Sequence, residues 1–230
     1  MRKNDFYASV FNLPNVEISG IGTNLNCVSG VFPSEDKLIQ LCLYEQLIEA
    51  KFDRPIPWVT GGTSVVLPLL FKKQVPAGVN HFRVGETLFF GADLFNDNTI
   101  EGMHHDVFKL HAQIVEVNEK PKVPIGYMGQ NPSGEEVEVA EEDYGVISSR
   151  ALLDIGVLDI SKTDFIIPDD DRLELIGGSS DMIVVDLGDA ASEYAVGDYI
   201  TFDLKYMGAL RLLNSDYIDK RIVTPDLVSS

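Results

Sequence analysis

The chain has 230 residues, 45% hydrophobic and 23% charged, so it is long enough to bury a core and has the composition of a folded globular protein. Its 36 acidic and 18 basic residues give a net charge of −18, which disfavours binding to nucleic acid and to anionic membrane surfaces. Residues 131–203 hold 19 acidic side chains against three basic ones, so most of the acidity belongs to the C-terminal half.

The first hundred residues alternate short apolar runs with a helix-length segment, which predicts strand/helix units and a parallel sheet. Three strands are expected, over residues 16–21, 56–60 and 81–84. A helix should follow Ser34 as its N-cap, and a short apolar helix should cover residues 65–71. The long helix should turn one apolar face to the core, made of Leu38, Leu41, Cys42 and Ile48.

After about residue 103 a two-residue alternation appears, as in Leu110, Ala112 and Ile114, and predicts a β-rich half. Further strands are expected over residues 146–153, 173–176, 182–187 and 199–204, with turns at 131–134 and 197–198. We place the boundary near Gly102, which gives domains of residues 1–102 and 103–230.

Cysteine content and chain pattern indicate the compartment. Cys27 and Cys42 are too few for a secreted disulfide framework and lack the spacing of a zinc site. There is no signal-peptide pattern and no run of 18 apolar residues, so we expect a cytoplasmic protein. The four histidines have no metal-ligand spacing, and we expect no metal.

Two glycine-containing loops are the best candidates for a binding site. Gly61-Gly62-Thr63-Ser64 follows one expected strand and could present backbone N–H groups and hydroxyls to an anion. Arg83-Val84-Gly85-Glu86 ends the next strand, so both loops should lie at the same edge of the sheet. The alternatives are a glycine turn in which Ser64 only caps a helix, and an ordinary ion pair for Arg83.

Other motifs are weaker. No GxSxG, HExxH, P-loop or GxGxxG occurs, so hydrolase and nucleotide-binding functions gain no support. The acidic runs 141–143 and 169–171 lack the alternate spacing of a calcium loop. Gly177–Asp181 is a small-residue turn whose backbone N–H groups could hold a carboxylate, although composition alone favours an ordinary hairpin.

Several segments, in this order, resemble the alanine racemase-like family of pyridoxal-phosphate enzymes, and most closely its ornithine racemase branch. The matching segments are Val16–Leu25, Gly61–Ser64, Asn80–Gly91, Glu101–Phe108, Glu119–Gly126, Glu174–Asp181 and Tyr206–Arg211. The resemblance implies the last strand/helix units of a (β/α)₈ barrel followed by a β-rich C-terminal domain. It also implies a homodimer and an amino-acid substrate.

The resemblance assigns roles to individual residues. Thr63, Ser64 and the amides of Gly85 and Glu86 would hold the phosphate of pyridoxal 5′-phosphate, and Tyr206 would also reach it. Arg83 would contact the pyridine nitrogen, which weakens the ring as an electron sink and favours α-proton exchange over transamination. Asp181 would lie at the rim of the partner's active site and orient the turn that approaches the substrate carboxylate.

The chain departs from the family at two places. The Schiff-base lysine lies on the first barrel strand, and none of the eleven lysines here falls in a matching segment. In the family, the partner subunit donates a catalytic tyrosine. Its place falls near Gly156-Val157, where this sequence has no tyrosine, so the second base is unassigned. We therefore expect a C-terminal part of an amino-acid racemase of ornithine or alanine type that is inactive by itself. A noncatalytic binding module on the same scaffold is the alternative.

Overall fold

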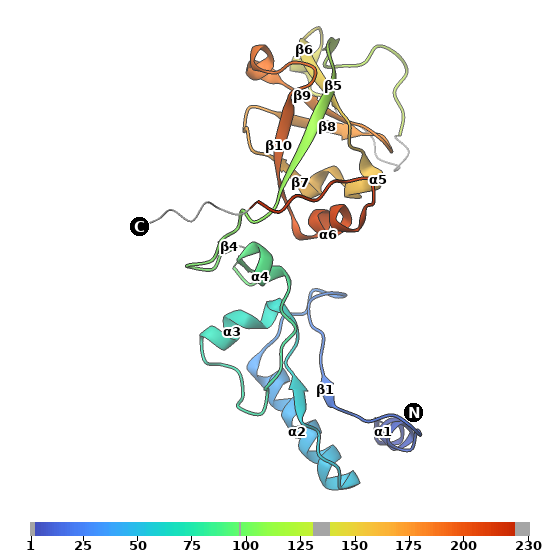
Figure 1. The fold of residues 1–230 in the computed structure, drawn as a ribbon, viewed down its shortest axis with the longest axis vertical. Coiled ribbons are helices and arrows are strands. Elements are labelled where there is room, and N and C mark those ends of the chain that lie inside the picture. The colour runs from blue at the N-terminus through green and yellow to red at the C-terminus, as the bar shows by residue number, and fades with distance from the viewer. Residues whose placement is uncertain (1–2, 97, 131–138, 224–230) are drawn as a thin grey trace. The chain divides into compact units, whose positions relative to one another are not determined.

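A computed structural model describes residues 3–96, 98–130 and 139–223, which belong to two compact units (Figure 1). Unit 1 is Met1–Val107 and unit 2 is Phe108–Ser230, so the division falls a few residues after Gly102. The expected turn at 131–134 lies outside the described residues. Within the described part of the chain, every helix is too short or too polar to cross a bilayer.

Unit 1 combines helices with short strands. Its helices are α1 (Lys3–Phe11), α2 (Glu35–Phe52), η1 (Ser64–Val66), α3 (Leu67–Phe71) and α4 (Glu86–Phe90). Its strands are β1 (Gly20–Gly22), β2 (Trp58–Thr60), β3 (Ala92–Asp93) and β4 (Asn98–Thr99).

The expected parallel pairing is present in unit 1, but the strands are shorter than expected. β1 pairs with β2 in parallel over three residues, and a parallel bridge joins Thr60 to His81. Pro57 has no N–H to donate, so β2 begins only at the next residue. The Asn80 side chain accepts the N–H of Val59 at 2.9 Å and donates to the Pro57 carbonyl at 2.9 Å. The expected strand over residues 81–84 is reduced to the His81 bridge, although backbone hydrogen bonds from Gly61 to His81 and from Arg83 to Gly62 continue beside it.

The long helix forms as expected after Ser34, whose backbone is extended. Its hydroxyl bonds the Asp36 carboxylate, and no side-chain cap bond is made to the helix backbone. The expected apolar face is confirmed. A small core joins α2 to β2 and the loops after it, and its buried residues are Leu38, Val59, Val66 and Val79.

Unit 2 is a β-rich fold with short helices. Its strands are β5 (Lys109–Pro121), β6 (Ile147–Leu153), β7 (Ile166–Pro168), β8 (Glu174–Gly178), β9 (Ile183–Asp186) and β10 (Tyr199–Leu204). Its helices are η2 (Glu141–Asp143), α5 (Val157–Ile160), η3 (Thr163–Phe165), η4 (Gly188–Glu193) and α6 (Tyr206–Asn214).

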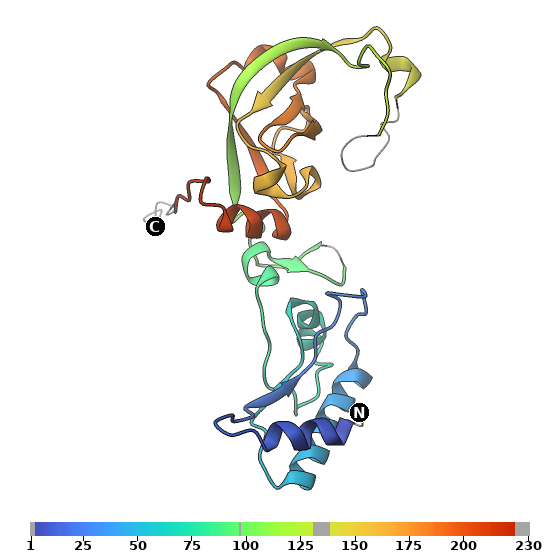
Figure 2. The same cartoon turned by 90° about the vertical axis from the view of Figure 1, so that its right-hand side faces the viewer.

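The six strands of unit 2 form one antiparallel, nearly closed sheet in the order β7-β10-β5-β6-β9-β8. β5 is long and bent (Figure 2). It pairs with β10 in its first half and with β6 in its second, and the register shifts between Ile114 and Glu116, where a bulge permits the bend. Leu110, Ala112 and Ile114 are buried, which confirms the expected alternation. The expected strands of this half are present, while β7, α5 and α6 were not expected.

Candidate functional site

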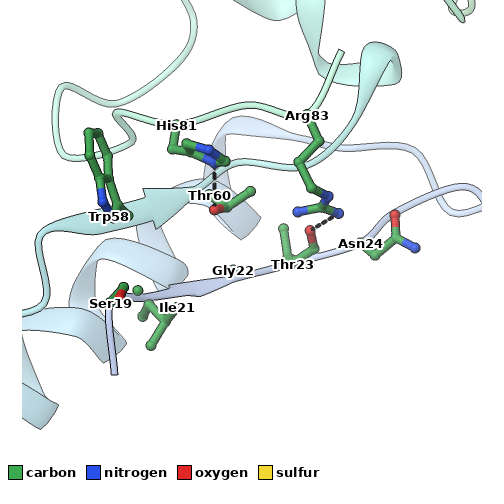
Figure 3. Close-up of a pocket in the computed structure, with 10 residues that line it drawn as sticks. Ser19, Ile21, Gly22, Thr23, Asn24, Trp58, Thr60, His81 and Arg83 are labelled. Carbon is green, nitrogen blue, oxygen red and sulfur yellow. Dashed lines mark hydrogen bonds between the residues drawn. The ribbon is translucent and has the colours of Figure 1, made fainter. Parts of the chain in front are cut away.

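An open cavity of about 480 Å³ lies on one face of the β1–β2 pair (Figure 3). Val59 is buried in the core beneath α2, and side chains alternate along a strand, so Trp58 and Thr60 point to the opposite face. A Cβ on Gly20 would lie 2.8 Å from the Trp58 Cβ, and a Cβ on Gly22 would lie 2.8 Å from that of Thr60. The absence of side chains at both glycines leaves this part of the face open.

The two loops singled out in the sequence are joined by backbone hydrogen bonds. Gly61 donates its N–H to the His81 carbonyl, and Arg83 donates its N–H to the Gly62 carbonyl, both at 2.9 Å. Gly62 has a φ of 125°, which favours glycine, and a Cβ on Gly61 would lie 2.6 Å from Cγ1 of Val79. The glycine pair therefore allows the two loops to lie side by side, as expected.

Ser64 connects these loops through its side chain. It is buried, and its Oγ accepts the N–H groups of Gly85 and Thr87, each at 3.2 Å. A hydroxyl has two acceptor positions and one hydrogen, so these two bonds leave the hydrogen to be donated. Ser64 and Gly85, both predicted to bind phosphate, thus lie within hydrogen-bond distance of each other.

Thr63 and Glu86 flank this contact. Thr63 precedes η1 with an extended backbone, and its carbonyl accepts the N–H of Val66 at 3.0 Å. Glu86 is the first residue of α4 and is half-buried, and burial raises the pKa of its carboxyl above the ordinary value. The contribution of Glu86 to phosphate binding through its amide stays a prediction.

Arg83 lines the open cavity, and Figure 3 shows its side chain directed toward Thr23. Its Nη2 donates to the Thr23 carbonyl at 3.4 Å, and its side chain is exposed. This long bond holds the guanidinium weakly. The group therefore keeps N–H donors for a ligand in the cavity, such as the ring nitrogen of an aromatic cofactor.

Of the residues that line this cavity, the sequence interpretation named only Arg83 as a site residue, and it missed Trp58, Thr60 and His81 among others. The Thr60 Oγ1 and His81 Nδ1 atoms share a hydrogen bond of 2.9 Å, and the His81 and Trp58 ring centroids are 5.8 Å apart. The signal was present in the two-residue alternation, because His81 and Arg83 on one strand fall on the same face. In the described part of the chain no His, Cys, Asp and Glu side chains gather as a metal site.

Asp181 and Tyr206 belong to unit 2, so their places at the site stay predictions. Asp181 is exposed, and its Oδ2 accepts the Ser180 hydroxyl at 2.7 Å. The Ser179 Oγ accepts the N–H groups of Asp181 and Met182, at 3.4 and 3.1 Å, which orders the turn. Tyr206 is the first residue of α6.

The turn that carries Asp181 is held by two backbone hydrogen bonds from the first residues of α5. Val157 and Leu158 donate their N–H groups to the carbonyls of Ser179 and Ser180, at 3.0 and 3.1 Å. This contact depends on Gly156, because a Cβ there would lie 2.0 Å from the Ser180 oxygen. The Gly156-Val157 segment and the Gly177–Asp181 turn, which the sequence singled out separately, are therefore one structural element.

Comparison with known proteins identifies relatives for most of the chain. It is 40% identical over 214 residues to the ornithine racemase of Acetoanaerobium sticklandii and 32% identical over 203 residues to the lysine racemase of Thermotoga maritima. These matches cover 93% and 88% of this chain but 60% and 56% of the relatives, so the chain spans less than two thirds of either. No family model matches the chain.

A solved structure supports the same relationship at the level of the fold. The alanine racemase of Bartonella henselae, determined with covalently bound pyridoxal phosphate, aligns with a TM-score of 0.52 at 18% identity. The alignment covers 86% of this chain and 52% of that protein. Taken with the two sequence relatives, this likeness supports an alanine racemase-like family, of whose members the chain matches a C-terminal portion.

Proposed function

We propose that this chain supplies the phosphate- and pyridine-binding side of a pyridoxal-phosphate-dependent amino-acid racemase. Unit 1 would then be the C-terminal part of a (β/α)₈ barrel, and unit 2 the β-domain of the alanine racemase C-terminal type. When bound, pyridoxal 5′-phosphate would supply an electron sink for removal of the substrate α-proton. The residues of this chain would contribute binding and orientation to this chemistry.

The observation that carries the proposal is the Ser64 contact. One buried hydroxyl accepts two amide N–H groups and keeps its own hydrogen to donate, next to the loop that bears Arg83. A phosphate needs several hydrogen-bond donors in one place, and the guanidinium adds a charged donor two residues before Gly85. Tyr206 would complete the phosphate site.

The proposed substrate is a basic amino acid. The two sequence relatives are named for ornithine and lysine, and the net charge of −18 attracts a cationic side chain. Asp181 would act at the rim of the active site of a second protomer by orienting its turn. In a complete racemase, Asp181→Ala should lower turnover or substrate affinity and leave cofactor absorbance nearly unchanged, because unit 1 holds the cofactor.

The experiment uses the only tryptophan of the chain, Trp58, which lines the cavity. Pyridoxal phosphate absorbs where indole emits, so binding should quench Trp58 fluorescence in a saturable way. Arg83→Leu should weaken this binding at least tenfold. Arg54→Leu is the matched control, since Arg54 is exposed in the same unit and packs over Phe11 outside the cavity.

The outcomes separate the proposal from a noncatalytic module. Saturable quenching that Arg83→Leu weakens and Arg54→Leu leaves intact supports the cofactor role. Equal quenching in both variants, or none in the wild-type chain, refutes it. A binding module without the cofactor would bind neither pyridoxal phosphate nor free phosphate at this site.

A further inference from the structure

The turn that carries Asp181 depends on α5, and α5 is too short to be stable by itself. It consists of four residues, Val157–Ile160, and a helix of about one turn does not persist in water without outside contacts. The chain leaves the helix at Ser161, where φ is 73°, and the Ser161 N–H donates to the Val157 carbonyl at 2.8 Å. The carbonyls that follow Val157 need partners from outside the helix.

Arg211 provides one of these partners. It lies in the last turn of α6, and its Nη2 donates to the Leu158 carbonyl at 2.9 Å. The N–H of Leu158 donates to the Ser180 carbonyl at 3.1 Å. The backbone of Leu158 is therefore bonded to the turn through its N–H and to α6 through its carbonyl. The guanidinium is a charged donor, which makes this hydrogen bond stronger than one between neutral groups.

Two further contacts join α5 to α6, which lie side by side in Figure 1. Ser215 follows the last residue of α6, and its hydroxyl donates to the Asp159 Oδ1 at 2.8 Å. Ile160 and Leu212 are buried in the same apolar cluster. The position of α5 is therefore set by α6.

The other end of α6 is fixed on η3. The Lys205 N–H donates to the Phe165 carbonyl at 2.9 Å, and a Cβ on Gly208 would lie 2.8 Å from the same oxygen. Glycine thus allows α6 to approach η3 closely. The helix begins at Tyr206, so the element that would bring a donor to the cofactor phosphate also carries Arg211.

We propose that Arg211 is a positioning residue for the Asp181 turn. It holds α5 through the Leu158 carbonyl, and α5 holds the turn through the amides of Val157 and Leu158. This inference rests on the proposed function, in which the turn approaches the substrate carboxylate at the rim of the active site of a second protomer. Arg211 then sets the affinity for the substrate without touching it.

The first test measures the contact in the full chain. Arg211→Met keeps the apolar part of the side chain and removes the donor, and Arg211 is exposed, so unit 2 should still fold. Hydrogen exchange at the Val157 and Leu158 amides should become at least about tenfold faster. Arg221→Met is the matched control, because it removes the same group from an exposed position beyond α6 and should leave both amides unchanged.

The second test measures the consequence in the holoenzyme. Arg211→Met should raise KM for ornithine at least about fivefold, change kcat less than about twofold and leave cofactor absorbance unchanged. Adding Arg211→Met to Asp181→Ala should raise KM little further, because both changes act through the same turn. A general loss of stability would instead lower cofactor binding and kcat together.

Unchanged exchange at both amides in Arg211→Met, or equal acceleration in Arg221→Met, overturns the inference. Full additivity of Arg211→Met and Asp181→Ala in KM also overturns it, because Arg211 would then act by another route than the turn. Faster exchange in a protein that neither binds pyridoxal phosphate nor racemises ornithine supports the support of the turn by Arg211 and refutes only the proposed function.

Discussion

Gly156 is the position where a single added carbon should have the largest local effect in unit 2. Its backbone is extended, with φ of −130°, so alanine meets no conformational penalty there. The conflict is steric, because the new Cβ would lie 2.0 Å from the Ser180 oxygen and 2.4 Å from the Asp181 nitrogen. Both are backbone atoms that cannot rotate away, so the Ser179–Asp181 turn must move.

The cost follows from what that movement breaks. The hydrogen bonds from Val157 to Ser179 and from Leu158 to Ser180 hold the turn, and each contributes about 0.5–1.5 kcal/mol net. Overpacking in a fixed environment costs about 1–3 kcal/mol. This cost and the loss of the hydrogen bonds do not add in full, because the movement of the turn that relieves the steric overlap also breaks the bonds. Replacing glycine also restricts the unfolded chain, and this stabilises the folded state by about 0.4–1 kcal/mol. We expect Gly156→Ala to lower the free energy of unfolding of unit 2 by about 2–4 kcal/mol.

Urea unfolding followed by circular dichroism measures this loss, and hydrogen exchange at the Val157 and Leu158 amides localises it. The control is Gly129→Ala, where a Cβ would meet no atom within 4 Å and the backbone is not left-handed. That variant should change the free energy of unfolding by less than about 1 kcal/mol. Unfolding of Gly156→Ala at the wild-type urea concentration, with unchanged exchange at both amides, would show that the contact is not formed.

Ser64→Ala should destabilise unit 1 by about 1–3 kcal/mol in the same unfolding assay, because the amides of Gly85 and Thr87 lose their acceptor; unchanged stability would contradict the contact. The Asp170 carboxyl should titrate by NMR at about 2, because Arg172 bonds it, and Arg172→Ala should return its pKa toward 3.8. The pKa of Asp170 is lower in the folded state, so its pairing with Arg172 contributes fully to the free energy of unfolding above pH 3.8. This contribution is lost as the pH falls through about 2. Pyridoxal phosphate at a hundred times its dissociation constant should stabilise unit 1 by about 2.7 kcal/mol.

The fold could be predicted where one periodic signal decided the structure. β10 has the bounds that the apolar alternation predicts, Tyr199–Leu204, and the covered face of α2 is the expected one. Prediction failed for the third strand of unit 1, which is reduced to the bridge between Thr60 and His81. The short β7 pairs only with β10, over three residues, and a segment of that length carries no periodic signal of its own.

The candidate site, like the fold, could be predicted from the sequence only in part. The glycine loops could be recognised because Gly61 and Gly62 have conformational and steric roles that no other residue fills. The hydrogen bond between Thr60 and His81 could not be predicted, since it depends on the register between β2 and the segment after it. The link between Gly156 and the Asp181 turn is also invisible in sequence, because it joins segments more than 20 residues apart through a close backbone contact.

The distribution of charge reconciles an anion site with an acidic chain. Unit 1 contains 12 acidic and 8 basic residues, so it carries only −4 of the net −18. Charges more than about 8–10 Å from a ligand are largely screened at physiological salt, so nearby donors decide whether an anion binds. Near Ser64 these donors are its own hydroxyl and the Arg83 guanidinium on the adjoining loop, because the amides of Gly85 and Thr87 already donate to the Ser64 Oγ. The larger part of the acidity therefore belongs to unit 2 and not to the unit that carries the proposed phosphate site.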